Sequence, residues 1–213
     1  MTRLFFIVAI LTISRVTFAQ SQEYQQSMQT ALGKFQQISS VADVQQLGNQ
    51  FQMIANAEPT EWLPLYYQAQ CFILMSFMEP TDTNKKESYL DEAEKILNKL
   101  TETVPNESEV NTLQAFFYVG RLVINPMERG MQYSSMASTS LEKALALEPG
   151  NPRAKMMKLQ LDIGAAPYMG QDPKSYCPEA KELMAKWDEY VPKSPLYPMW
   201  GKDQMAGILK GCE

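Results

Sequence analysis

The stretch SLEKALALEPGNPRA, residues 140–154, indicates how the chain folds. A run of good helix formers ends at Pro149, a glycine–asparagine turn follows, and a second run of helix formers begins after Pro152. Because proline cannot continue a helix, and glycine and asparagine favour turns, the stretch predicts the end of one helix and the start of the next. Whether this junction recurs along the chain decides the fold class.

Prolines that follow helical patterns recur at nearly constant spacing. Pro59, Pro105, Pro149 and Pro192 are separated by 46, 44 and 43 residues. The positions twelve, eight and five residues before each proline are apolar, and this spacing places side chains on one face of a helix. The chain therefore contains four amphipathic helices that each end at a proline. In chain order the twelve positions are Leu47, Phe51 and Ile54; Ala93, Leu97 and Leu100; Ala137, Leu141 and Ala144; and Ala180, Met184 and Trp187.

The pattern resembles the tetratricopeptide repeat family. In that family the second helix of a unit carries a small residue, a large apolar residue four positions later, and a small residue after three more, before a proline. Ala137, Leu141, Ala144 and Pro149 match all four positions, and the other three units match in part. The resemblance covers residues 43–191 and implies an all-α, tetratricopeptide-like array of about four stacked helical hairpins, an α-solenoid. We expect further helices over residues 21–38 and 198–210 to open and close the array.

The proline spacing is longer than the usual period of this family, which is about 34 residues. Residues 79–87 and 125–132 contain proline, glycine and polar residues between the two helical patterns of a unit. We expect both stretches to be loops that account for the additional length.

The first nineteen residues are typical of a secretory signal peptide. They contain Arg3, an apolar run over residues 4–13, and small residues before a cleavage point after Ala19. The apolar run is too short for a transmembrane helix, which needs about 20 residues. We therefore expect an exported protein, periplasmic or secreted, whose mature chain is one domain over residues 20–213 and does not insert into a membrane.

The composition excludes several classes of function. The chain has no histidine, so catalytic triads with a histidine base and histidine ligands to zinc are absent. Its 24 acidic and 19 basic residues give a formal net charge of −5, which disfavours binding to nucleic acid. The acidic clusters lie between apolar helix positions with lysines among them, as on a solvated helix face. We expect no catalytic residues, no cofactor and no metal site.

The family resemblance implies that the protein binds a partner, a peptide segment or another envelope protein, on a concave face lined by the first helix of each unit. The positions that the resemblance assigns to this face are Tyr66, Gln70, Thr112, Phe116, Arg153, Met156 and Gln160.

Two other functions remain open. Residues 164–180 form the longest non-helical stretch, and a pocket there, lined by Tyr168, Tyr176 or Trp200, would indicate a small-molecule or glycan binding protein. An enzyme that uses carboxylates alone is the third alternative.

The three cysteines predict one disulfide bond. Cys71 lies within an apolar helical stretch, whereas Cys177 and Cys212 lie near the start of one predicted helix and just beyond the end of another. If those helices are antiparallel, the two cysteines meet at the same end. In an exported chain this favours a Cys177–Cys212 bridge over metal ligation or pairing between molecules.

Export with loss of residues 1–19 predicts a defined N-terminus. Mass spectrometry of the exported protein should find Gln20 as the first residue. Recovery of the exported protein with an intact Met1 would contradict the assignment of a cleaved signal peptide.

Overall fold

The computed structural model describes residues 22–213, so the predicted signal peptide lies outside the described residues. Every regular element in residues 22–213 is helical, which confirms the predicted all-α class. Residues 22–33 form the opening helix, followed by η1 (Lys34–Gln37). The array continues with α2 (Val41–Ala57), α3 (Leu63–Met78), α4 (Thr83–Thr103), α5 (Ser108–Ile124), α6 (Pro126–Leu147) and α7 (Pro152–Ala165). Then come η2 (Ala166–Met169), η3 (Pro173–Tyr176), α8 (Cys177–Ala185), η4 (Trp187–Glu189) and α9 (Lys202–Lys210).

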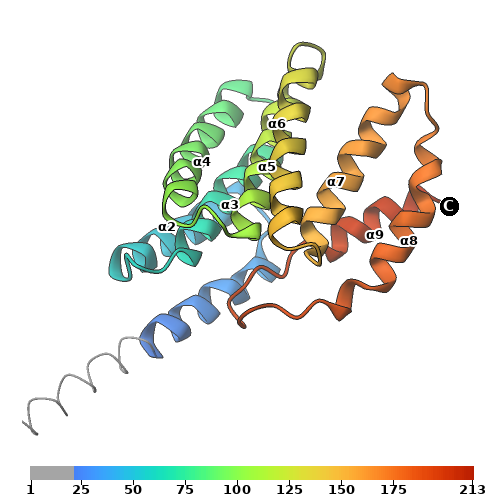
Figure 1. Ribbon diagram of the computed structural model, residues 1–213. Helices are drawn as coiled ribbons and strands as arrows, with labels where there is room; N and C mark the ends of the chain where they lie inside the picture. The colour runs from blue at the N-terminus through green and yellow to red at the C-terminus, as the bar shows by residue number, and fades with distance from the viewer. Residues whose placement is uncertain (1–21) are drawn as a thin grey trace, which may run out of the picture.

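Successive helices from α2 to α7 pack against each other as a stack of hairpins (Figure 1). Helix α5 also packs against both α3 and α7, the helices two positions away in the chain. This extra contact places α3, α5 and α7 in the more closely spaced layer, while α4 and α6 lie in the other layer. When the helices of one layer lie closer together than those of the other, the stack curves toward the closely spaced layer. Helices α3, α5 and α7 therefore form the concave side.

The two stretches expected to be loops are largely helical, which corrects the sequence interpretation. Helix α4 begins at Thr83, where the Asp82 side chain accepts a hydrogen bond from the amide of Lys85. Helix α6 begins at Pro126, after an Asn125 cap. The first residue of a helix has no hydrogen-bond partner for its backbone N–H within the helix. Proline, which lacks this N–H, can therefore occupy that position and start the helix without interrupting it. The long period therefore comes from long helices: α4 has 21 residues and α6 has 22.

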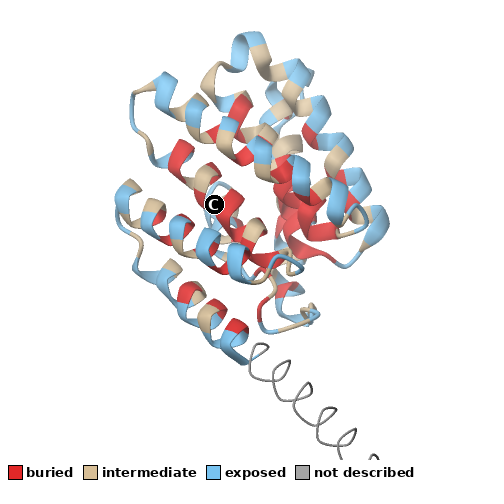
Figure 2. Ribbon diagram, turned by 90° about the vertical axis from the view of Figure 1, so that its left-hand side faces the viewer, coloured by how far each residue is buried: buried red, intermediate tan, exposed pale blue. Residues whose placement is uncertain are grey.

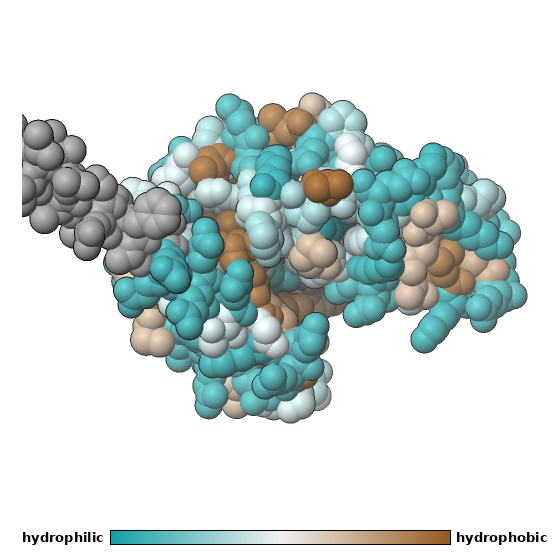
Figure 3. Space-filling view, turned by 90° about the horizontal axis from the view of Figure 1, so that it is seen from below, coloured by the Kyte–Doolittle hydropathy of each residue, from teal (hydrophilic) through white to brown (hydrophobic). Residues whose placement is uncertain are grey.

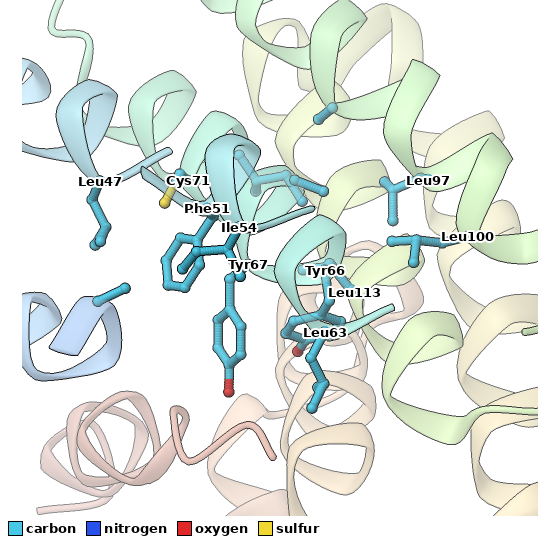
Figure 4. Packing of buried hydrophobic residues seen from close by; sticks show 14 of the residues in the cluster. Leu47, Phe51, Ile54, Leu63, Tyr66, Tyr67, Cys71, Leu97, Leu100 and Leu113 are labelled. Atoms are coloured by element: carbon cyan, nitrogen blue, oxygen red, sulfur yellow. The ribbon is translucent and has the colours of Figure 1, made fainter. Parts of the chain in front are cut away.

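The core confirms the apolar spacing read from the sequence. All twelve positions aligned on the four prolines are buried except Met184, which is partly buried. Figure 2 shows buried residues on the helix surfaces that face one another and exposed residues on the outer surfaces. The buried residues form two clusters, and the partly buried Phe116 and Tyr118 pack against both. Figure 4 shows part of the first cluster, where side chains from α2, α3, α4 and α5 meet.

The predicted disulfide bond is present. Cys177 at the start of α8 is bonded to Cys212, just after α9, with the two Cα atoms 5.7 Å apart. Helices α8 and α9 pack against each other, so the bond fastens the end of the array. Cys71 is a buried free thiol. A disulfide is typical of a protein that folds in an oxidising compartment, which agrees with export.

Across residues 22–213, no helix combines the length and the apolar character that a membrane crossing requires.

Loss of the disulfide should destabilise the fold. The bond joins residues 35 positions apart, and in the chain-entropy model a closed loop of this size contributes about 3 to 4 kcal/mol to the free energy of unfolding. We expect a double variant, Cys177→Ala with Cys212→Ala, to lose this amount in denaturant titrations. Reduced wild-type protein should unfold at the same midpoint as the variant, and a variant as stable as the oxidised wild type would contradict the prediction.

Candidate functional site

The seven residues predicted to line the concave face lie on α3, α5 and α7, but the structure does not leave that face open. Five of the side chains are buried, Phe116 is partly buried, and Gln160 is exposed. Because buried side chains have no free surface, they cannot contact a partner unless the structure rearranges. The buried five are Tyr66, Gln70, Thr112, Arg153 and Met156.

Residues 190–201, here called the C-terminal segment, cover the ends of α3 and α5. In Figure 1 this stretch runs from the C-terminal helices back beneath the array. The Tyr67 hydroxyl donates to the backbone oxygen of Leu196 at 2.7 Å, and the Trp200 indole N–H donates to the Tyr66 hydroxyl at 2.8 Å. Figure 4 shows the Tyr67 hydroxyl pointing away from the apolar cluster, toward this part of the chain. The groove expected for a peptide is thus filled by the protein itself.

A buried ion pair lies where α5 and α7 begin. The Arg153 guanidinium donates to both carboxylate oxygens of Glu109, with Nε–Oε2 at 2.9 Å and Nη2–Oε1 at 2.6 Å. The Asn151 amide donates to the same carboxylate at 2.8 Å and also caps α7. Burial raises the pKa of the Glu109 carboxyl, and the hydrogen bonds from Arg153 offset part of that rise. Sequence analysis did not identify Glu109.

The C-terminal segment closes over this pair. The Arg153 guanidinium lies 5.2 Å from the centre of the Tyr190 ring, within the range of a cation–π contact. Gly201 has a φ of 109°, a conformation that side chains other than glycine rarely adopt. A Cβ at Gly201 would also lie 2.9 Å from the Trp187 ring and 3.2 Å from the Arg153 side chain. Glycine is therefore required where the segment turns into α9.

Three aromatic rings, here called the aromatic ladder, stack at the edge of the covered region. The Phe77 and Phe116 rings are 5.1 Å apart at 12°, and the Phe116 and Trp200 rings are 5.5 Å apart at 26°. They come from α3, α5 and the C-terminal segment. Phe77 is 39% exposed, and the other two are partly buried. Phe116 lies between the other two rings, so a flat aromatic ligand can continue the stack only at its ends, and the exposed Phe77 ring is the more accessible end.

Further apolar residues lie near the ladder residues in the sequence. Met78 follows Phe77, Met199 precedes Trp200, and Val123 lies two helical turns beyond Phe116; all three are exposed. Phe77 was missed by the sequence analysis, although it lies three turns along α3 on the side of Tyr66 and Gln70. Continuing the concave positions to the end of α3 would have identified it.

Two surface pockets lie away from the ladder. One, of about 410 Å³, lies among α6, α7 and α8, where Lys155, Lys158 and Glu182 are among its lining residues. The other, of about 520 Å³, lies between residues 22–33 and α2 and is lined in part by Tyr24 and Met53. In Figure 3 apolar side chains follow a furrow beside the N-terminal helical residues, within a mostly hydrophilic face. A ligand on the ladder would therefore bind outside both of these pockets.

Residues 164–180, expected to be the longest non-helical stretch and proposed as an alternative site, are mostly helical, because η2 and η3 lie between α7 and α8. This stretch, called the loop below, does not gather its aromatic residues. Tyr168 is 82% exposed, and the Tyr176 hydroxyl contacts the Gln171 side chain within the loop. Trp200 contacts Tyr66 and Phe116 on the concave side instead. The structure therefore assigns Trp200 to the ladder.

Two observations concern metal binding and thiol chemistry. Among residues 22–213, no group of three or more Cys, Asp and Glu side chains is arranged to hold a metal ion. The Cys71 thiol is buried, and burial raises its pKa, which disfavours the reactive thiolate. What the site offers is an apolar aromatic surface for binding.

Comparison with known proteins finds a similar solved structure. No protein-family model matches the chain, and no curated protein matches it in sequence. Among solved structures, the HusA haemophore from Porphyromonas gingivalis matches with a TM-score of 0.76 and 26% sequence identity. The match covers 89% of this chain and 92% of the haemophore chain.

The predicted main function, binding of a peptide segment or envelope protein in an open groove, is wrong. The C-terminal segment fills that groove, and the similar solved structure is a haemophore, a protein named for carrying haem. The findings favour the alternative, small-molecule binding. A small molecule then replaces the protein as the expected partner.

Breaking the buried ion pair should be costly and pH dependent. Arg153→Met would leave the Glu109 carboxylate buried without its cation, and we expect a loss of about 3 to 5 kcal/mol in the free energy of unfolding at neutral pH. The change raises the pKa of Glu109 further, so this carboxyl is protonated in the folded state as the pH falls. Protonation removes the unpaired charge, and the loss relative to wild type should therefore shrink toward acid pH.

The control is Lys186→Met, which breaks the exposed pair between Lys186 and Glu182. Because water screens an exposed pair, we expect no measurable change in stability. If the two substitutions lowered the free energy of unfolding equally in urea titrations, the Glu109–Arg153 pair would contribute no more to stability than an exposed pair, which would contradict this prediction.

Proposed function

We propose that this chain is an exported haem-binding protein that holds the porphyrin against the aromatic ladder of Phe77, Phe116 and Trp200. The observation that carries the haem assignment is the likeness to the HusA haemophore, which extends over most of both chains. The arrangement of the ladder supports the choice of site, because it is the place where three elements present stacked rings at the surface.

A porphyrin fits this surface by shape and by chemistry. Its macrocycle is flat, aromatic and apolar on both faces, so it can continue a stack of near-parallel rings. Each aromatic pair contributes about 0.5 to 1.5 kcal/mol beyond the apolar area that it buries. The exposed Met78 and Met199 are next to ladder residues in sequence, and thioether side chains adapt to a ligand edge.

The absence of histidine restricts how the iron could be held. Histidine is a common axial ligand of haem iron, and this chain has none. Methionine is another known axial ligand, and the exposed Met78 and Met199 are next to ladder residues in sequence. In this proposal most of the binding free energy comes from stacking and burial of the ring face, and the iron contributes less.

Three further aspects belong to the proposal. The protein binds and releases its ligand without changing it, so it is not an enzyme. The signal peptide is removed after Ala19, and the mature chain acts in the periplasm or outside the cell. The helical hairpins are of the tetratricopeptide type, here used as a scaffold for a small molecule.

Porphyrin titration tests the proposal. Haem added to the purified protein should give a saturable change in the Soret absorbance, and iron-free protoporphyrin should compete for the same site. Phe77→Ala removes the most exposed ring of the ladder, and we expect it to weaken haem binding by roughly tenfold, since a ring at a contact centre is worth about 1.4 kcal/mol or more.

Tyr168→Ala is the matched control, because it removes an exposed aromatic ring from the loop of residues 164–180. Binding that weakens in Tyr168→Ala and not in Phe77→Ala would place the ligand at the loop. No saturable binding of haem or protoporphyrin by the wild-type protein would rule out the proposed function.

A further inference from the structure

Trp200 is held by two groups that are distant in sequence. Its indole N–H donates to the Tyr66 hydroxyl on α3, and its ring stacks on Phe116 of α5. The first contact joins residues 134 positions apart. Since Trp200 is the one ring of the ladder that does not belong to a helix of the array, its orientation depends on these contacts.

The surroundings of Tyr66 hold its side chain in a fixed position. Its side chain is fully buried, and its ring makes edge-to-face contacts with Trp62 at 5.8 Å and with Tyr67 at 5.2 Å. Burial raises the pKa of the Tyr66 phenol well above its ordinary value, so the phenol is neutral at physiological pH. A hydroxyl that is fixed in position gives the indole N–H a fixed acceptor, and this restrains the tilt of the Trp200 ring.

We infer that Tyr66 is a positioning residue for ligand binding: it fixes Trp200, the ring on which Phe116 stacks, and so sets the tilt of the ladder that the porphyrin continues. This inference rests on the proposed function. It assigns a role in specificity to a side chain that cannot itself touch the ligand. It also makes residues 190–201 a part of the binding site, in addition to their role as a cover for the concave face.

The neighbouring Tyr67 offers a matched control. Its hydroxyl donates to the backbone oxygen of Leu196, so it also fastens the C-terminal segment to α3. It makes no hydrogen bond to Trp200. Tyr66→Phe and Tyr67→Phe therefore each remove one hydroxyl and one hydrogen bond to the same segment, and the two variants should lose similar amounts of thermal stability.

The two variants should differ in porphyrin binding. We expect Tyr66→Phe to weaken the affinity for haem by about threefold to tenfold, the range that corresponds to one lost hydrogen bond, and Tyr67→Phe to leave it unchanged. In a Trp200→Phe background, Tyr66→Phe should have no further effect on affinity, because the indole N–H is already absent. The NMR signal of the Trp200 indole N–H should shift in Tyr66→Phe and stay in place in Tyr67→Phe.

Each other outcome contradicts a definite part of the account. Equal weakening in both tyrosine variants would mean that attachment of the segment matters and the orientation of Trp200 does not. Unchanged affinity in Tyr66→Phe, or an undiminished effect in the Trp200→Phe background, would also overturn the positioning role. If wild-type protein binds neither haem nor protoporphyrin, the proposed function fails, and the indole signal then tests only whether Tyr66 orients Trp200.

Discussion

Glu109 and Arg153 form an ion pair that is closed off from solvent, and much of the structure around it is arranged to keep it so. Removing two charges from water costs several kcal/mol for each ion unless their hydrogen bonds are satisfied. Here Arg153 contacts both carboxylate oxygens, Asn151 supplies another donor, and the Tyr190 ring covers the guanidinium. The pair fixes the starts of α5 and α7 beside each other, and it requires a cover.

The C-terminal segment is that cover, and this has a direct consequence for function. A curved stack of helical hairpins exposes a long concave groove when its inner helices are bare. In this protein Tyr66, Tyr67 and Arg153 use that surface to hold residues 190–201. The surface that stays accessible is at the edge of the cover, where Phe77, Phe116 and Trp200 stack. An exposed ring at the end of a short stack suits a planar small molecule better than an extended peptide.

The parts of the fold that depend on local patterns could be predicted from the sequence. Apolar spacing before Pro59, Pro105 and Pro149 identified the helices, because burial of one helix face leaves a periodic pattern. The pairing of Cys177 with Cys212 followed from their places at the ends of two neighbouring helices. The starts of α4 and α6 were misread because proline and asparagine occur both in loops and at the first turn of a helix.

The candidate site is formed by contacts between residues that are distant in sequence, and such contacts produce no periodic pattern in the sequence. Tyr67 and Leu196 are 129 positions apart, and nothing near either residue in sequence indicates that they meet. Glu109 looked like one more acidic residue on a helix, although it is buried beside Arg153. The density of aromatic residues in the C-terminal segment, with Tyr190, Tyr197 and Trp200 among prolines, was the available signal that this stretch packs on the array.

The most direct test of the account is to map where a porphyrin binds. Gallium protoporphyrin, a diamagnetic analogue of haem, can be titrated into isotope-labelled protein while NMR spectra are recorded. The account predicts that ring-current shifts are largest for the Phe77 side chain and are smaller for Phe116 and for the indole N–H of Trp200. Shifts that concentrate instead in residues 164–180, with these three side chains unaffected, would contradict the central claim that the aromatic ladder is the ligand site.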